Sequence, residues 1–176
     1  MEYPAEHLKI VNALLRDGRF LVEGETAFAC LKEHQAFYQQ FFRASFQLEL
    51  SIEADYALLK SSRQNDALAR DICIFLAILS YEIDREGRNL LETLQFSVFS
   101  LEDIEQKFLL SSFLEILEAT PGLRDADRRS RFITQIARRN LIVKMENDSF
   151  RFTPAFRYFL DYARTFNHLL VVEEEE

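Results

Sequence analysis

The sequence predicts a mainly α-helical fold with small β-hairpins, arranged as tandem winged-helix domains. Apolar residues recur at helical spacing along most of the 176-residue chain. Twice, at residues 46–60 and again at residues 141–153, a helical stretch leads into a short alternating segment that turns back on itself. The predicted domains span residues 1–62 and 63–168. An acidic tail at residues 169–176 follows them, and we expect it to be disordered.

The first domain is predicted to place two helices before its hairpin. Gly18 follows the first helix, because glycine readily takes the left-handed conformation found at helix ends. Phe46, Leu48, Leu50 and Ile52 alternate with polar residues, which predicts a strand with one buried face. In order, we expect a helix at residues 5–16, an extended piece at 19–22, a helix at 26–44, and hairpin strands at 46–53 and 56–60.

The second domain is predicted to begin after a polar boundary at residues 61–66. Ser100 and Asp103 have the spacing of a capping box at a helix start. Asn147 and Asp148 suit a tight hairpin turn, because both residues tolerate a positive φ. In order, we expect a helix at 67–85, a polar loop at 86–93, an extended piece at 96–99, helices at 101–111, 113–119 and 125–140, strands at 141–146 and 150–153, and a last helix at 154–167.

Composition makes an enzyme, a metal site and a bound cofactor unexpected. His7, His34 and His168 fall on three separate predicted helices, with no second ligand at metal-binding spacing. Cys30 and Cys73 fall in apolar runs and are expected to be buried and reduced. No nucleotide-binding or hydrolase motif occurs. No apolar run approaches the roughly 20 residues that a bilayer requires, so we expect a cytoplasmic, nucleoid-associated protein without a membrane contact.

The most informative segment is an arginine-rich helix that leads directly into the second hairpin. Between residues 124 and 144 seven bases and two acids give a charge of +5, whereas the whole chain carries −8 and the remainder therefore −13. Helical spacing separates the apolar face of this helix from its basic face. The candidate DNA-binding residues are Arg124, Arg128, Arg129, Arg131, Arg138 and Lys144. Arginine suits phosphate because its planar guanidinium donates two hydrogen bonds while keeping its charge. The alternatives are a solvated face paired with acids of the chain, and an acidic segment of a partner protein.

The first hairpin carries acids instead of bases. Glu49, Glu53 and Asp55 make a contact with phosphate unfavourable there. Its open edge is suited to strand addition by a partner protein, and the alternative is a purely structural hairpin.

Five segments of the chain carry distinctive patterns of apolar and turn residues. They are residues 14–22 (LLRDGRFLV), 37–42 (FYQQFF), 48–50 (LEL), 69–79 (ARDICIFLAIL) and 150–159 (FRFTPAFRYF). With these segments the chain resembles, over residues 8–160, the MukE-like and MksE-like subunits of bacterial condensins.

The resemblance implies a non-enzymatic kite subunit with tandem winged-helix domains. Such a subunit forms a homodimer, binds a MukF-like kleisin, and joins an SMC ATPase through that kleisin on DNA. The ATPase of such a complex lies in the SMC partner, which agrees with the missing nucleotide motif. Chromosome organisation and plasmid defence remain the two alternatives for the whole system. The rival interpretation is a winged-helix transcription regulator, which as an isolated dimer would recognise a specific DNA sequence.

Overall fold

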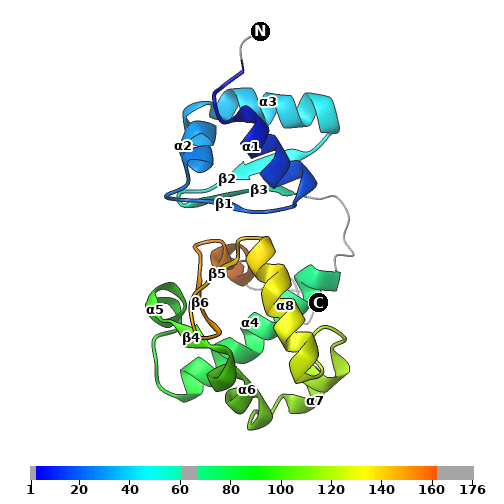
Figure 1. Ribbon diagram of the computed structural model, residues 1–176, viewed down its shortest axis with the longest axis vertical. Helices are drawn as coiled ribbons and strands as arrows, with labels where there is room; N and C mark the ends of the chain where they lie inside the picture. Colours follow the sequence, from blue (N-terminus) through cyan, green and yellow to red (C-terminus); the bar gives the residue numbers. More distant parts are fainter. Residues whose placement is uncertain (1–2, 61–66, 162–176) are drawn as a thin grey trace, which may run out of the picture.

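Two helical units, each built around a small antiparallel sheet, form the part of the chain that the computed structural model describes, residues 3–60 and 67–161. Figure 1 shows the first unit stacked on the second along the long axis of the molecule. The helices of the first unit are α1 (His7–Val11), the π-helical turn η1 (Asn12–Arg16), α2 (Thr26–Glu33) and α3 (Gln35–Phe46). Those of the second are α4 (Ala67–Arg85), α5 (Leu90–Phe96), α6 (Leu101–Leu109), α7 (Leu114–Ala119) and α8 (Ala126–Arg138), and helical residues at 156–161 follow. The mainly helical fold class is therefore confirmed.

Each unit has a three-stranded sheet with its hairpin strands side by side. The strands are β1 (Leu21–Val22), β2 (Glu49–Ile52), β3 (Tyr56–Lys60), β4 (Phe99–Ser100), β5 (Ile142–Lys144) and β6 (Ser149–Phe152). The sheet orders are β1-β3-β2 and β4-β6-β5, and every neighbouring pair is antiparallel. Both predicted hairpins are confirmed. The second turns at Asn147 and Asp148, whose φ angles are 55° and 51°.

Three sequence-based expectations were wrong. The single helix at 26–44 is two helices, because His34 leaves helical geometry at φ −110° and ψ 34°. The loop at 86–93 contains the start of α5, where the Asn89 side chain accepts a 3.0 Å hydrogen bond from the Glu92 N–H and caps the helix. Phe46 ends α3 instead of beginning a strand, since Gln47 turns the chain in the left-handed region at φ 57°.

Some expectations concern parts of the chain outside the described residues. These are the polar boundary at residues 61–66, the end of the last helix at residues 162–167, and the acidic tail at residues 169–176.

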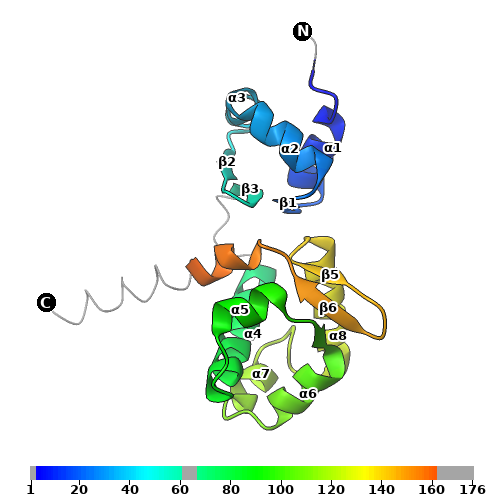
Figure 2. The ribbon, with the colours of Figure 1, turned by 90° about the vertical axis from the view of Figure 1, so that its left-hand side faces the viewer.

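Strands β1 and β3 of the first sheet have buried residues on both faces, and this joins the two units. Leu21, Leu50 and Ala57 pack into the core of the first unit. From the opposite face, Phe20, Val22, Tyr56 and Leu58 belong to the core of the second unit. Successive side chains of a strand point to opposite faces, so one short sheet serves both cores. Figure 2 shows β1 and β3 above β5, β6 and the helical residues that follow them.

Candidate nucleic-acid interface

Helix α8 begins at a well-formed cap. The Asp125 carboxylate accepts a 2.8 Å hydrogen bond from the Arg128 N–H, as an N-cap residue does. This bond, together with the neighbouring Arg124 and Arg128 guanidinium groups, holds the pKa of Asp125 below its usual value. The carboxylate is therefore ionised at neutral pH and complements the positive end of the helix dipole.

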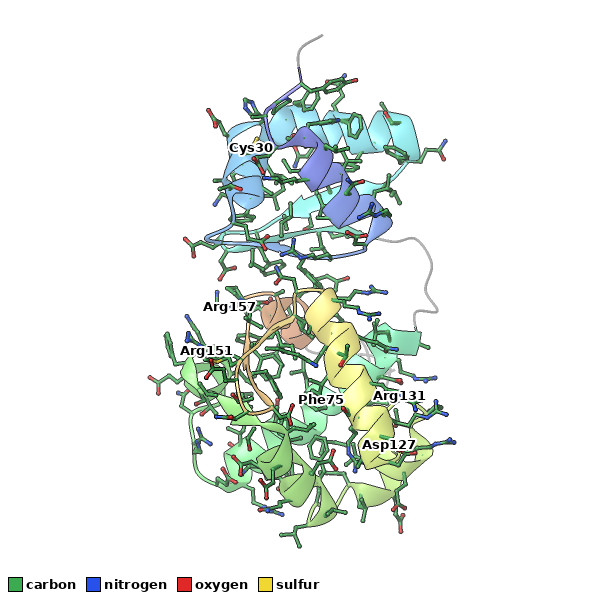
Figure 3. All side chains as sticks on the ribbon, in the orientation of Figure 1. Cys30, Phe75, Asp127, Arg131, Arg151 and Arg157 are labelled. Carbon is green, nitrogen blue, oxygen red and sulfur yellow. The ribbon has the colours of Figure 1, made fainter. Side chains whose placement is uncertain are left out.

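The apolar side of α8 fixes which face of the helix is exposed. Phe132, Ile133 and Ile136 are buried in the core of the second unit, and the Phe132 ring lies 5.1 Å from that of Phe75 on α4. Arg131 projects from the side of α8 that faces away from Phe75 (Figure 3).

We call Arg128, Arg131 and Arg138 the arginine face. All three side chains are exposed. Among the residues that the structure describes, none of the three forms an ion pair with a carboxylate. The alternative of a face neutralised by salt bridges with the described part of the chain therefore does not hold for these arginines.

Arg129, a predicted DNA-binding residue, does not belong to the arginine face. It lies on the side of α8 that faces the rest of the second unit. It is buried, and its Nε and Nη2 atoms donate to the two carboxylate oxygens of Glu105 at 2.6 and 2.5 Å. Its Nη1 donates to the Leu123 carbonyl at 2.7 Å. These contacts join α8 to α6 and engage all three nitrogens of the guanidinium. Helical spacing already indicated that Arg129 faces the core, because it precedes the buried Phe132 and Ile133 by three and four residues.

The two remaining candidates flank the arginine face. Arg124 is exposed just before α8, and its Nε lies 3.3 Å from the Asp125 carboxylate. Lys144 on β5 is exposed and donates a 3.0 Å hydrogen bond to the Thr134 hydroxyl. That bond ties the hairpin to α8 and holds Lys144 beside the helix.

Arg151, an exposed base on β6, was not among the predicted DNA-binding residues. Its position between the buried Phe150 and Phe152 predicts an outward side chain, because strand side chains alternate. Figure 3 places it on the opposite side of the second unit from Arg131, so it does not belong to the arginine face.

The C-terminal end of α8 is held by the first unit. The Phe20 N–H donates to the Arg139 carbonyl at 2.9 Å, and the Asn140 side chain donates to the Phe20 carbonyl at 3.0 Å. A second contact across the units is the ion pair between Arg157 and Asp55. The direction in which α8 presents its arginines is therefore set by both units.

The first hairpin presents an open strand edge. Strand β2 pairs with β3 on one side only, which leaves its other edge unpaired within the sheet. A hollow of about 730 Å³ adjoins this strand. Its lining comes from α3 and β2 and consists of Gln39, Arg43, Gln47, Leu48, Glu49 and Leu50.

Among the described residues, no group of three or more His, Cys, Asp and Glu side chains is arranged to hold a metal ion. Both cysteines are free and partly buried. None of the described helices combines the length and the apolar character that crossing a membrane requires.

The fold and this surface define a class of protein: two packed helical units, each with a small antiparallel sheet, that present a basic helix. The family model for the condensin complex protein MksE matches residues 6–164. The chain therefore belongs to the MksE family of condensin complex proteins. No curated protein matches it.

Proposed function

We propose that the protein is a non-enzymatic accessory subunit of an SMC-type condensin complex whose arginine face lies against DNA. In this proposal its two units are tandem winged-helix domains, at residues 1–62 and 63–168, and two copies form a dimer that binds a MukF-like kleisin. Membership of the MksE family supports a place in a condensin complex. The observation that carries the DNA contact is the exposed arginine face, which has no carboxylate partner among the described residues.

The spacing of the arginine face suits an extended polyanion. At a rise of about 1.5 Å per residue, Arg128 and Arg131 are about 4.5 Å apart along the axis of α8, and Arg131 and Arg138 about 10.5 Å apart. Each guanidinium can donate two hydrogen bonds to a phosphate without losing its charge. Lys144 and Arg124 extend the positive field on either side. Such contacts are indifferent to base sequence, as a subunit acting along a chromosome or a plasmid requires.

The charge of the rest of the chain limits DNA binding by the isolated protein. The net charge is −8 although the arginine helix region is positive. Long-range repulsion between the acidic remainder of the chain and DNA weakens association, most of all at low ionic strength. We therefore place the DNA contact in the assembled complex, where other subunits add affinity.

The open edge of β2 is our proposed contact for the kleisin. An extended segment of a partner could add a fourth strand there, with its side chains in the hollow beside α3. Arg43 and Glu49 in that hollow would allow the partner to carry charges of either sign.

The test of the DNA contact is the triple variant R128E/R131E/R138E in the assembled complex. Three substitutions at two charges each lower the net charge by six, from −8 to −14. We expect DNA affinity to fall by at least about tenfold and the slope of log K against log salt to decrease by about 2–3. Fluorescence anisotropy with a random duplex over a salt series measures both quantities.

The matched control is K9E/R16E/K32E, which makes the same charge change with exposed residues of the first unit that lie outside the hollow beside β2. A loss that depends only on net charge would appear equally in both variants. Equal affinity and equal salt slope for the wild-type complex and R128E/R131E/R138E would overturn the DNA assignment. Tight, sequence-specific binding by the isolated protein would instead favour a transcription regulator.

A further inference from the structure

The arginine face is a concentration of positive charge on an acidic chain. The sequence contains 29 acids and 21 lysines and arginines, yet Arg128, Arg131 and Arg138 lack a carboxylate partner among the described residues. An unneutralised basic surface on such a chain attracts the chain's own acids whenever they can reach it.

The sequence offers one dense run of acids for this role. Residues 173–176 are four consecutive glutamates, whereas no more than two acids are adjacent anywhere else in the sequence. This run lies outside the described residues, so its charge and its distance along the chain are the quantities that matter here.

The segment that leads into the last described residues is held at the C-terminal end of α8. The Thr153 hydroxyl donates to the Asn140 carbonyl at 2.6 Å, which fixes this part of the chain at the C-terminal end of α8. The helical residues 156–161 then cover only about 9 Å. With the helix continuing to residue 167, as the sequence predicts, residues 162–172 bridge about 26 Å, and the glutamate run itself adds about 13 Å. Because α8 is about 20 Å long, this total of about 39 Å brings the arginine face within reach of the glutamate run.

The dimensions of the two segments also match. The arginine face extends about 15 Å along α8, and four residues of extended chain extend about 13 Å. Carboxylates bind guanidinium groups through paired hydrogen bonds, as phosphates do. Exposed ion pairs each contribute little, but tethering raises the local concentration of the acidic run to the millimolar range. The resulting contact is weak and sensitive to salt, so a polyanion of higher charge density displaces it.

We propose that the glutamate run at residues 173–176 occupies the arginine face of its own chain when no nucleic acid is bound, so that DNA must displace it. This inference rests on the proposed role of the arginine face in binding DNA. Its consequence is a threshold: dense phosphate, as on a duplex, displaces the run, whereas weaker anions do not.

The first experiment needs no DNA. The Nε–Hε signals of Arg128, Arg131 and Arg138 are recorded by NMR in the 176-residue chain and assigned through single Arg→Lys substitutions. Neutralising the run in E173Q/E174Q/E175Q/E176Q should shift these three signals. Raising the salt concentration should shift the wild-type signals towards the same positions, because salt screens exposed ion pairs.

The matched control is E23Q/E33Q/E115Q/E118Q, which removes four exposed carboxylates elsewhere and changes the net charge equally, from −8 to −4. It should leave the three arginine signals unchanged. Unchanged signals in E173Q/E174Q/E175Q/E176Q, or equal shifts in both variants, would overturn the inference. A dependence of the wild-type signals on protein concentration would also contradict it, because the contact would then join two chains.

The second experiment compares the same variants for binding to a random duplex within the assembled complex. Neutralising residues 173–176 should tighten binding about three- to tenfold at low salt, and the gain should disappear at high salt, whereas the control variant should bind like the wild type. Equal tightening by the control variant would assign the effect to net charge and overturn the inference. If R128E/R131E/R138E binds DNA as the wild type does, the proposed function fails, and the DNA-free arginine signals still decide the inference.

Discussion

The side-chain amide of Asn140 donates a 3.0 Å hydrogen bond to the main-chain carbonyl of Phe20, which lies 120 positions earlier in the chain. The Phe20 N–H in turn donates to the carbonyl of Arg139 at 2.9 Å. Asn140 has a φ of 61° and directly follows the C-cap of α8. The residue that terminates the arginine helix therefore also attaches it to the first unit.

Replacing Asn140 should destabilise the fold in two separable ways. In N140A the left-handed backbone is strained and the side-chain hydrogen bonds are lost, so the free energy of unfolding should fall by about 2–3 kcal/mol. In N140G the backbone is relaxed and only the hydrogen bonds are lost, so the decrease should be about 1 kcal/mol. Urea denaturation followed by circular dichroism measures both values. Equal losses in the two variants would show that the conformation of Asn140 contributes nothing.

Arg129 and Arg131 should respond differently to the same substitution, although only one residue separates them. R129A leaves the partly buried Glu105 carboxylate and the Leu123 carbonyl without their partner, so unfolding should become easier by about 2–4 kcal/mol. R131A removes an exposed side chain without an ion pair among the described residues and should change stability by less than about 0.5 kcal/mol.

The effects of R129A and R131A on DNA affinity should be the reverse of their effects on stability. Once corrected for the folded fraction, R129A should bind DNA as the wild type does, and R131A should bind it more weakly. An R129A/E105A double variant that loses as much stability as the two single variants combined would contradict a direct pairing of these residues.

The elements that the sequence predicts well are those with a local physical signal. The buried stripe of α8 and the Asn147–Asp148 turn each follow from residues within one or two turns of chain. The extended pieces expected at residues 19–22 and 96–99 overlap β1 and β4, but these strands are only two residues long, and their pairing with β3 and β6 could not be predicted from periodicity.

Residues distant in the sequence set the remaining features. The carbonyl that Asn140 contacts is 120 residues away, and the carboxylate that Arg129 contacts is 24 residues away. Neither partner could be chosen from local spacing, although the helical position of Arg129 already indicated that it faces the core. The break at His34 has neither proline nor glycine to mark it.

Gly122 should not tolerate a side chain. A Cβ at this position would lie 2.2 Å from Oδ2 and 3.2 Å from Cγ of Asp71, a buried residue of α4. G122A should therefore lower the free energy of unfolding by about 1–3 kcal/mol, because the carboxylate has little room to move. Thermal or urea denaturation measures this loss. In a D71A background the same substitution should cost much less, and an unchanged cost there would locate the strain elsewhere.

Tyr38 should make the first unit sensitive to alkali. Its ring is fully buried, and burial raises the pKa of its phenol to about 12. Because the folded state favours the neutral phenol, the stability it contributes is complete below about pH 10, the ordinary tyrosine value, and is lost as the pH rises towards 12. Tyrosinate absorbance should accordingly show late titration of Tyr38 in the folded protein and ordinary titration in urea. Y38F should remove one late step and move alkaline unfolding to higher pH. Y81F, at an exposed tyrosine, should do neither. A folded wild-type protein in which all tyrosines titrate together near pH 10 would contradict this assignment.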